Sequence, residues 1–222
     1  MLKFLYFTII ALILTGCMTT SRMDKLVKHK TSRHQLQVNV MDSSHFVLNT
    51  SRMASTEKLC ESKHKSFYII PAIVFWWWKN SINCKINNHY FINQFTVVLN
   101  RKANDEIWKN KLKDKKLEIC LDTVPNQFNY ASEGLFLFLF TEGYTYSHSE
   151  VLCPENQVFR VSYRLLQNDT AIKVGSFWTK YTKPEHNTNR SDKQFVEKFL
   201  DIQSDFFSTE SENLIVQIAK DL

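Results

Sequence analysis

Glycine and proline are scarce in this sequence, with four residues of each among 222. Nucleotide-binding folds built on glycine-rich phosphate loops need more glycine, and collagen-like or low-complexity chains need far more of both. Hydrophobic residues make up 44% and charged residues 23% of the chain. That balance is typical of a globular protein, and it excludes wholesale disorder and a protein with many membrane spans. The length suits one domain of ordinary size, or at most two small ones.

Catalytic and metal-binding motifs are missing as well. None of the seven histidines stands in an HExxH or HxH pattern, no cysteines form CxxC, and GxSxG does not occur. Ser147, His148 and Glu150 are close in sequence, but neighbours on a strand point to opposite faces, so this segment is interpreted as a solvated strand end. The sequence therefore predicts no enzyme, no catalytic residue, no metal and no cofactor. A periplasmic hydrolase with catalytic residues scattered along the chain is the alternative.

The chain begins with a short positive segment and an apolar run. Residues 4–14 are apolar except for Thr8, and this run is too short to be a permanent membrane span. A charged start, such a run and small residues after it are typical of a secretory signal. The run ends in Leu14-Thr15-Gly16-Cys17, which resembles the lipobox of bacterial lipoproteins.

The lipobox resemblance implies that residues 1–16 are a signal peptide that is cut off before Cys17. It also implies that the Cys17 thiol takes a diacylglycerol and that the new amino group is acylated. Two or three acyl chains anchor a protein stably in a membrane. The alternatives are an ordinary signal peptide or a single-pass anchor, with Cys17 incidental.

Residues 17–35 are predicted to be a lipidated N-terminus and flexible tether, and residues 36–222 a single globular domain. After Cys17 this segment has five basic residues against Asp24 alone. Two interpretations stay open: a solvated linker, or cations that lie against anionic headgroups. Met18 is not the aspartate that resembles an inner-membrane retention signal, and no acidic run suggests surface export. We therefore expect an outer-membrane protein that faces the periplasm.

The net charge of +6 is mild and spread along the chain. It falls to +5 when Lys3 leaves with the signal peptide, which argues against a nucleic-acid partner. The expected partners are the membrane, through the N-terminal lipid, and an envelope protein or lipid.

Four cysteines remain after Cys17, an even number that allows two disulfides in an oxidising compartment. They are Cys60, Cys84, Cys120 and Cys153. Cys60 and Cys84 flank one apolar segment, and Cys120 and Cys153 lie near the ends of another. These two local pairings are the first expectation, and four buried thiols are the alternative.

Hydrophobic periodicity indicates an α+β domain with a mostly antiparallel sheet and two long amphipathic helices packed on it. Residues 89–113 and the segment from Ser191 to the C-terminus have helical spacing, and the second helix is expected to break or shift near residues 208–211. Strands are expected over 34–48, 117–121, 134–140, 158–166 and 171–181, with 134–140 covered on both faces, whereas 49–65 is expected to be a loop.

Residues 67–78 form the most apolar segment after the signal. Pro71 argues against a helix, so a strand with the proline at an edge or bulge is predicted. The segment ends in Trp76, Trp77 and Trp78, with Trp77 on the opposite strand face from the other two. The first interpretation is that the tryptophan side chains on one face of this strand pack in the core. The second is that the triplet forms an aromatic binding patch.

The order of elements resembles that of envelope auxiliary lipoproteins, such as those that accompany lipid-transporting ABC systems or serve lipopolysaccharide assembly. The nearest local feature is Tyr163-Arg164-Leu165-Leu166, a turn, Gly175-Ser176-Phe177 and a final helix. The resemblance implies a membrane-anchored, non-enzymatic auxiliary or adaptor in the cell envelope, acting in transport or assembly of lipid or another envelope component.

Overall fold

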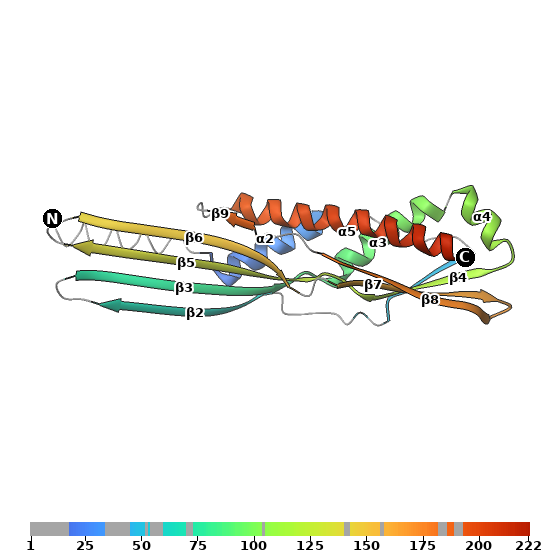
Figure 1. Ribbon diagram of the computed structural model, residues 1–222, viewed down its shortest axis with the longest axis horizontal. Coiled ribbons are helices and arrows are strands. Elements are labelled where there is room, and N and C mark those ends of the chain that lie inside the picture. Colours follow the sequence, from blue (N-terminus) through green and yellow to red (C-terminus); the bar gives the residue numbers. More distant parts are fainter. Residues whose placement is uncertain are drawn as a thin grey trace.

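The fold is α+β, with two sheets on one side and helices on the other (Figure 1). The computed structural model describes residues 18–33, 45–51, 53, 60–69, 73–103, 105–139, 143–155, 158–181, 186–188 and 193–222. The predicted fold class is therefore confirmed at this level. The expected single sheet is wrong, because the strands divide into a four-stranded and a five-stranded sheet.

Sheet A has the order β1-β4-β7-β8. β1 (Phe46–Asn49) is parallel to β4 (Lys116–Thr123), and β7 (Val158–Gln167) and β8 (Thr170–Lys180) continue the sheet antiparallel. The β7–β8 connection, predicted as a turn, is confirmed. Asn168 and Asp169 have φ of 50° and 60°, the left-handed values that a two-residue hairpin turn requires.

Sheet B is antiparallel throughout, in the order β2-β3-β5-β6-β9. Its strands are β2 (Cys60–Ile69), β3 (Ile73–Lys85), β5 (Gln127–Leu139), β6 (Gly143–Glu155) and the short β9 (His186–Thr188). Residues 60–65 are thus strand where a loop was expected. The apolar segment 67–78 contains the end of β2 and the start of β3, and Pro71 lies outside the described residues.

Helix α2 (Thr20–Arg33) corrects the predicted flexible tether. Thr19 caps its start, because the Arg22 backbone N–H donates to the Thr19 hydroxyl at 3.2 Å. Met23, Leu26 and Val27 are buried, so three- and four-residue spacing does give this segment an apolar stripe. The same core contains residues of both sheets and of α2, so the folded domain includes α2 and does not begin at residue 36.

The predicted helix 89–113 is two helices, α3 (Asn88–Ala103) and α4 (Glu106–Leu112). The interruption shifts the helical phase. Helical spacing without a break over 89–113 would bury Ile107, but its side chain is 61% exposed. Trp108 is buried instead, against Phe46, with ring centroids 5.4 Å apart.

Helix α5 (Lys193–Asp221) is continuous, so the break expected near residues 208–211 does not occur. The hydroxyls of Thr209 and Ser211 donate to the carbonyls four residues earlier, at 2.9 and 2.7 Å, which satisfies them within the helix. Phe207 is fully buried between α3 and sheet A, 4.8 Å from the Phe91 ring and 4.5 Å from that of Phe159. Ser191, where helical spacing begins in the sequence, lies outside the described residues.

The disulfide Cys60–Cys84 confirms the first expected pairing. The two residues lie directly opposite each other on β2 and β3. The second expected pairing is wrong. Cys120 is a half-buried thiol on β4 of sheet A, and Cys153 is a half-buried thiol on β6 of sheet B. Separation by sheets, which the sequence does not reveal, keeps them from bonding.

The C-terminal end of α5 is fixed to sheet A by Tyr163, whose buried hydroxyl donates to the Asp221 carboxylate. Lys173 Nζ lies 3.0 Å from Asp221 Oδ1. Gly175 faces the Tyr163 ring, and a Cβ at this glycine would come within 2.5 Å of it. The glycine therefore leaves room for the tyrosine that holds the helix end.

Tyr163→Phe is expected to reduce the loss of stability in strong alkali. Burial, and then the hydrogen bond to Asp221 and its negative charge, raise the pKa of Tyr163 to about 12. A raised pKa gives stability that is complete below the unfolded pKa of about 10 and is lost as pH rises toward the folded value. Urea unfolding across that range measures it. Equal slopes of stability against pH in the two proteins would contradict the expectation.

Candidate functional site

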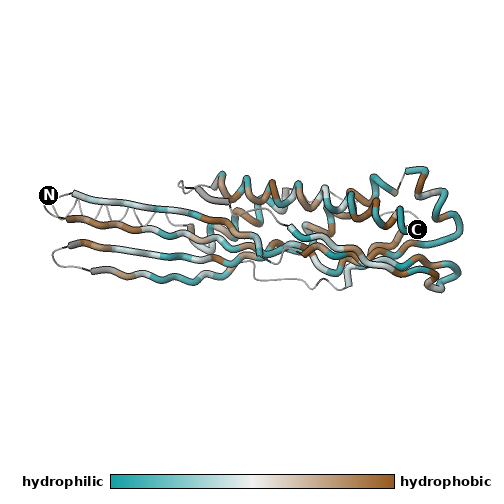
Figure 2. The backbone as a smooth tube through the Cα atoms, viewed as in Figure 1, coloured by the Kyte–Doolittle hydropathy of each residue, from teal (hydrophilic) through white to brown (hydrophobic). Residues whose placement is uncertain are grey.

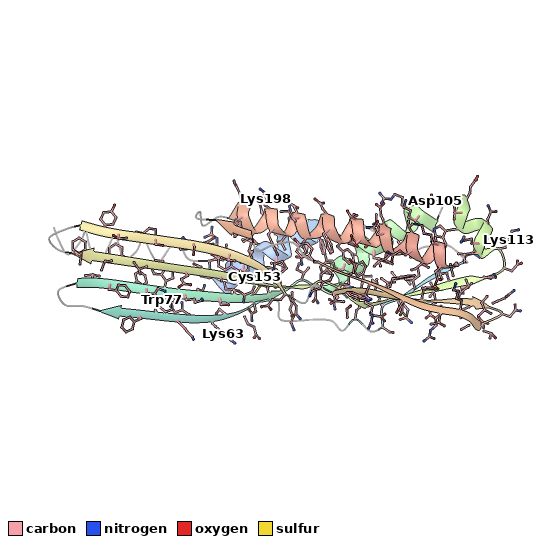
Figure 3. The ribbon with its side chains drawn as sticks, viewed as in Figure 1. Lys63, Trp77, Asp105, Lys113, Cys153 and Lys198 are labelled. Carbon is pink, nitrogen blue, oxygen red and sulfur yellow. A yellow bond between two sulfur atoms is a disulfide. The ribbon has the colours of Figure 1, made fainter. Side chains whose placement is uncertain are left out.

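Sheet B extends well beyond the helices (Figure 1). We call the part that none of the described helices covers the distal sheet end, made of residues 67–69 of β2, 73–78 of β3, 134–139 of β5 and 143–148 of β6. Figure 3 shows aromatic side chains along these strands, with Trp77 among them. The strand expected at 134–140 is central, between β3 and β6, but no described helix covers this part of it.

One face of the distal sheet end is continuous with the hydrophobic core. Ile82, Tyr130 and Leu152 form a fully buried row across β3, β5 and β6, on the face that the helices cover. Side chains two residues apart share a face. The same face therefore continues outward through Trp78, then through the row Trp76, Phe136 and Tyr146, and then through Val74, Phe138 and Tyr144.

The opposite face is apolar only at its outer part. Phe67, Trp77 and Leu135 lie in one row, and Phe75 and Leu137 follow toward the tip. Phe67 is 54% exposed, and on the helix-side face Tyr144 and Tyr146 are 74% and 54% exposed. A concentration of exposed large aromatics on one structural end marks a binding surface.

The tryptophan triplet follows the predicted alternation. Trp78 is 4% exposed, Trp77 is half-buried on the other face, and Trp76 is half-buried beside Trp78, with ring centroids 4.8 Å apart. The indole of Trp78 lies over Gly134, where a Cβ would come within 2.1 Å of the ring. Trp78 is therefore the buried member of the triplet within the distal sheet end, whereas Trp76 and Trp77 are only half-buried there.

Polar residues separate the core from the distal sheet end. Asn80, Ser132 and Glu150 form one row across the helix-side face, and Ser132 and Glu150 are 3% and 1% exposed. The Ser132 hydroxyl is 3.1 Å from His148 Nε2, and Glu150 Oε1 is 3.7 Å from the same nitrogen. The interpretation of this segment as a solvated strand end is therefore wrong for His148 and Glu150, whereas Ser147 and Ser149 are exposed.

Ser132, His148 and Glu150 do not form a catalytic relay. In a relay the serine and the carboxylate contact different nitrogens of the imidazole, so that one positions the ring while the other loses its proton. Here both contacts end on Nε2, and the serine is buried. The cluster instead closes the polar boundary of the core.

The described chain begins at this boundary. Asn80 Nδ2 donates to the Met18 carbonyl at 3.2 Å, and the Met18 side chain is 2% exposed. Cys17 itself lies outside the described residues.

Sheet A carries a shallow hollow of about 310 Å³ on the face away from the helices, between β4, β7 and β8. Glu118, Ser162 and Arg164 line it, and Glu118 accepts a 3.0 Å hydrogen bond from Asn49. The hollow is shallow, and the Cys120 thiol also lines it. It is a weaker candidate than the distal sheet end.

Sequence reasoning singled out 67–78 but missed the contribution of β6. Tyr144 and Tyr146 alternate with polar residues, a pattern that indicates a strand but not its neighbours. Only the pairing of β6 with β5 places Tyr144 beside Phe138 and Tyr146 beside Phe136, in the row that also contains Trp76.

None of the helices in the described parts of the chain is long and apolar enough to cross a membrane. Within those same parts, no group of three or more His, Cys, Asp or Glu side chains could hold a metal ion. Comparisons with protein-family models, with curated proteins and with solved structures found no match to this chain.

Proposed function

We propose that this protein is a bacterial lipoprotein, anchored in the envelope through lipid on Cys17, that acts as a non-enzymatic auxiliary or adaptor. Its binding surface is the distal sheet end, which takes an envelope lipid or protein. The observation that carries the proposal is the aromatic sheet end that extends past the helices with Phe67, Tyr144 and Tyr146 exposed.

The position of Met18 supports the link between anchor and binding surface. Met18, the residue after Cys17 in the sequence, lies at the Asn80 row, beside the aromatic residues of the distal sheet end. A lipid anchor there holds the distal sheet end at the membrane. Met18 in place of an acidic residue favours the outer membrane and its periplasmic side.

Helix α2 adds positive charge near the same place. Arg22 and Lys25 are exposed on it, whereas Lys28 is paired with Asp24 at 2.8 Å and Lys30 with Asp201 at 2.7 Å. Basic residues close to a membrane surface are attracted to anionic headgroups. The helix therefore supports an orientation in which the N-terminal side of the domain faces the lipid.

Cys17→Ser is expected to abolish acylation and to leave the chain uncleaved or released from the membrane, because the serine hydroxyl cannot replace the thiolate as lipid acceptor. Incorporation of labelled fatty acid and the mass of the purified protein measure it. Cys120→Ser is the matched control and should be acylated like the wild type. A Cys17→Ser protein that is still mature and acylated would refute the anchor.

A further inference from the structure

Large apolar residues lie on both faces of the distal sheet end near its tip, and on the face away from the helices β6 adds the polar Thr145 and Ser147. In the row of Trp76 the helix-side face carries Phe136 and Tyr146, and one residue further back the other face carries Phe67, Trp77 and Leu135. A protein partner seated on one face would leave the other face in water. A surrounding hydrocarbon medium covers both faces at once.

A polar boundary lies directly behind these rows. Lys65, Lys79 and Glu133 form a row on the face away from the helices. Trp77 Nε1 donates to Glu133 Oε1 at 3.0 Å, and Lys79 Nζ lies 3.3 Å from Glu133 Oε2. Figure 2 shows this hydrophilic segment between hydrophobic parts of the same strands. Indole rings between charged and apolar residues are typical of a membrane interface.

The apolar rows are long enough to enter one leaflet. Residues 73–78 of β3 are extended, and at about 3.3 Å per residue they cover about 20 Å. One leaflet contributes about 15 Å of hydrocarbon. The tip therefore reaches past the middle of the bilayer when Lys79 stays among the headgroups.

Open strand edges oppose such an insertion for a single copy. Backbone N–H and C=O groups without partners are very costly in hydrocarbon, so lipid-exposed sheet edges are not tolerated there. Within the described residues, β2 is one edge of sheet B, and β9 pairs with β6 only at residues 150–152. Both β2 and the outer part of β6 are therefore edges over the distal sheet end.

The strand directions allow copies of the chain to close these edges. Four strands that alternate in direction place β2 and β6 antiparallel to each other at the two edges. β6 of one copy can thus pair with β2 of the next and continue the same alternation. Such a head-to-tail contact repeats from copy to copy, and it gives a ring where the rotation between copies closes.

We propose that several copies of this chain join β6 to β2 at the distal sheet end, and that the joined strands enter the bilayer that holds the acyl chains of Cys17. The proposal rests on the lipid anchor of the proposed function. In this arrangement lipid covers the two faces of the distal sheet end, and further copies of the chain pair with its two edge strands.

Quenching of tryptophan fluorescence by brominated lipids tests the insertion. The full chain is produced in bacteria, extracted and reconstituted in phosphatidylethanolamine–phosphatidylglycerol vesicles with brominated acyl chains. In Trp108→Phe/Trp178→Phe, only the triplet emits, and we expect brominated lipid to remove more than half of its emission. The control Trp76→Phe/Trp77→Phe/Trp78→Phe keeps the two tryptophans outside the distal sheet end and should be unaffected. Equal emission of the triplet in brominated and ordinary vesicles would overturn the insertion.

Thiol cross-linking tests the assembly. Lys65 and Ser149 are exposed, share one row and face, and lie on β2 and β6. Lys65→Cys/Ser149→Cys, with Cys120 and Cys153 replaced by serine, should give a ladder of dimers, trimers and larger species with a flexible bismaleimide in membranes. A control variant with only one of the two new cysteines has a single reactive thiol in each copy, so the reagent joins at most two copies. Absence of species above the dimer in the double variant would overturn the joined sheet.

The outcomes separate this inference from the proposed function. Acylated Cys17 without quenching or a ladder would refute the inference and leave the anchor intact. Quenching together with a ladder supports the inference. Loss of acylation in the wild type would refute the proposed function itself, whatever the cross-linking shows.

Discussion

Trp78→Ala is expected to lower the free energy of unfolding by about 3–5 kcal/mol, the usual cost of truncating a buried large aromatic. Trp78 is 4% exposed and packs beside Trp76 and His148, with ring centroids 4.8 and 6.2 Å away. Alanine would leave an indole-sized void over Gly134, which has no side chain to fill it. Denaturant unfolding of a variant that begins at Met18 measures the effect.

Trp77→Ala is the matched control, because the same side chain is removed one residue away on the other face. Trp77 is half-buried, and its indole N–H bonds an exposed carboxylate at 3.0 Å. We expect a loss of about 1 kcal/mol, the net value of such a hydrogen bond and a little packing. Losses of equal size at the two positions would contradict core packing of Trp78.

Phe207→Ala should be comparably damaging, again by about 3–5 kcal/mol. Phe207 is fully buried and contacts Phe91 of α3 and Phe159 of sheet A, so its ring joins the helical layer to the sheet. Because domains have only about 5–15 kcal/mol of stability, this change alone removes a large share of it. Thermal and urea unfolding, each followed by circular dichroism, measure the loss.

Phe206→Ala controls for the loss of an aromatic ring from the same helix. Phe206 is half-buried and contacts Tyr181 at 4.6 Å between ring centroids. A partly exposed ring loses less transfer free energy and leaves no closed cavity, so its removal should cost less than half as much. A greater loss for Phe206 than for Phe207 would be incompatible with the core described above.

Local patterns were sufficient where one strand or helix decides its own structure. Alternation at Leu117, Ile119 and Leu121 predicted β4, and the polar turn before β8 predicted its hairpin. Those segments carry the signal in neighbouring residues. Helical spacing failed at Ile107, because an interruption after Ala103 shifts the phase of every later residue.

Only part of the candidate site could be predicted from the sequence, because the pairing of strands brings its residues together. The sequence by itself determined the fold class, the facing of the tryptophan triplet and the local pairing of Cys60 with Cys84. Only the tertiary structure decided that strands divide into two sheets, that Cys120 and Cys153 lie in different ones, and that Tyr146 stands beside Phe136 in the row of Trp76. Strand alternation assigns a side chain to a face within a few residues, whereas sheet order depends on contacts between residues far apart in the chain, which no local pattern encodes.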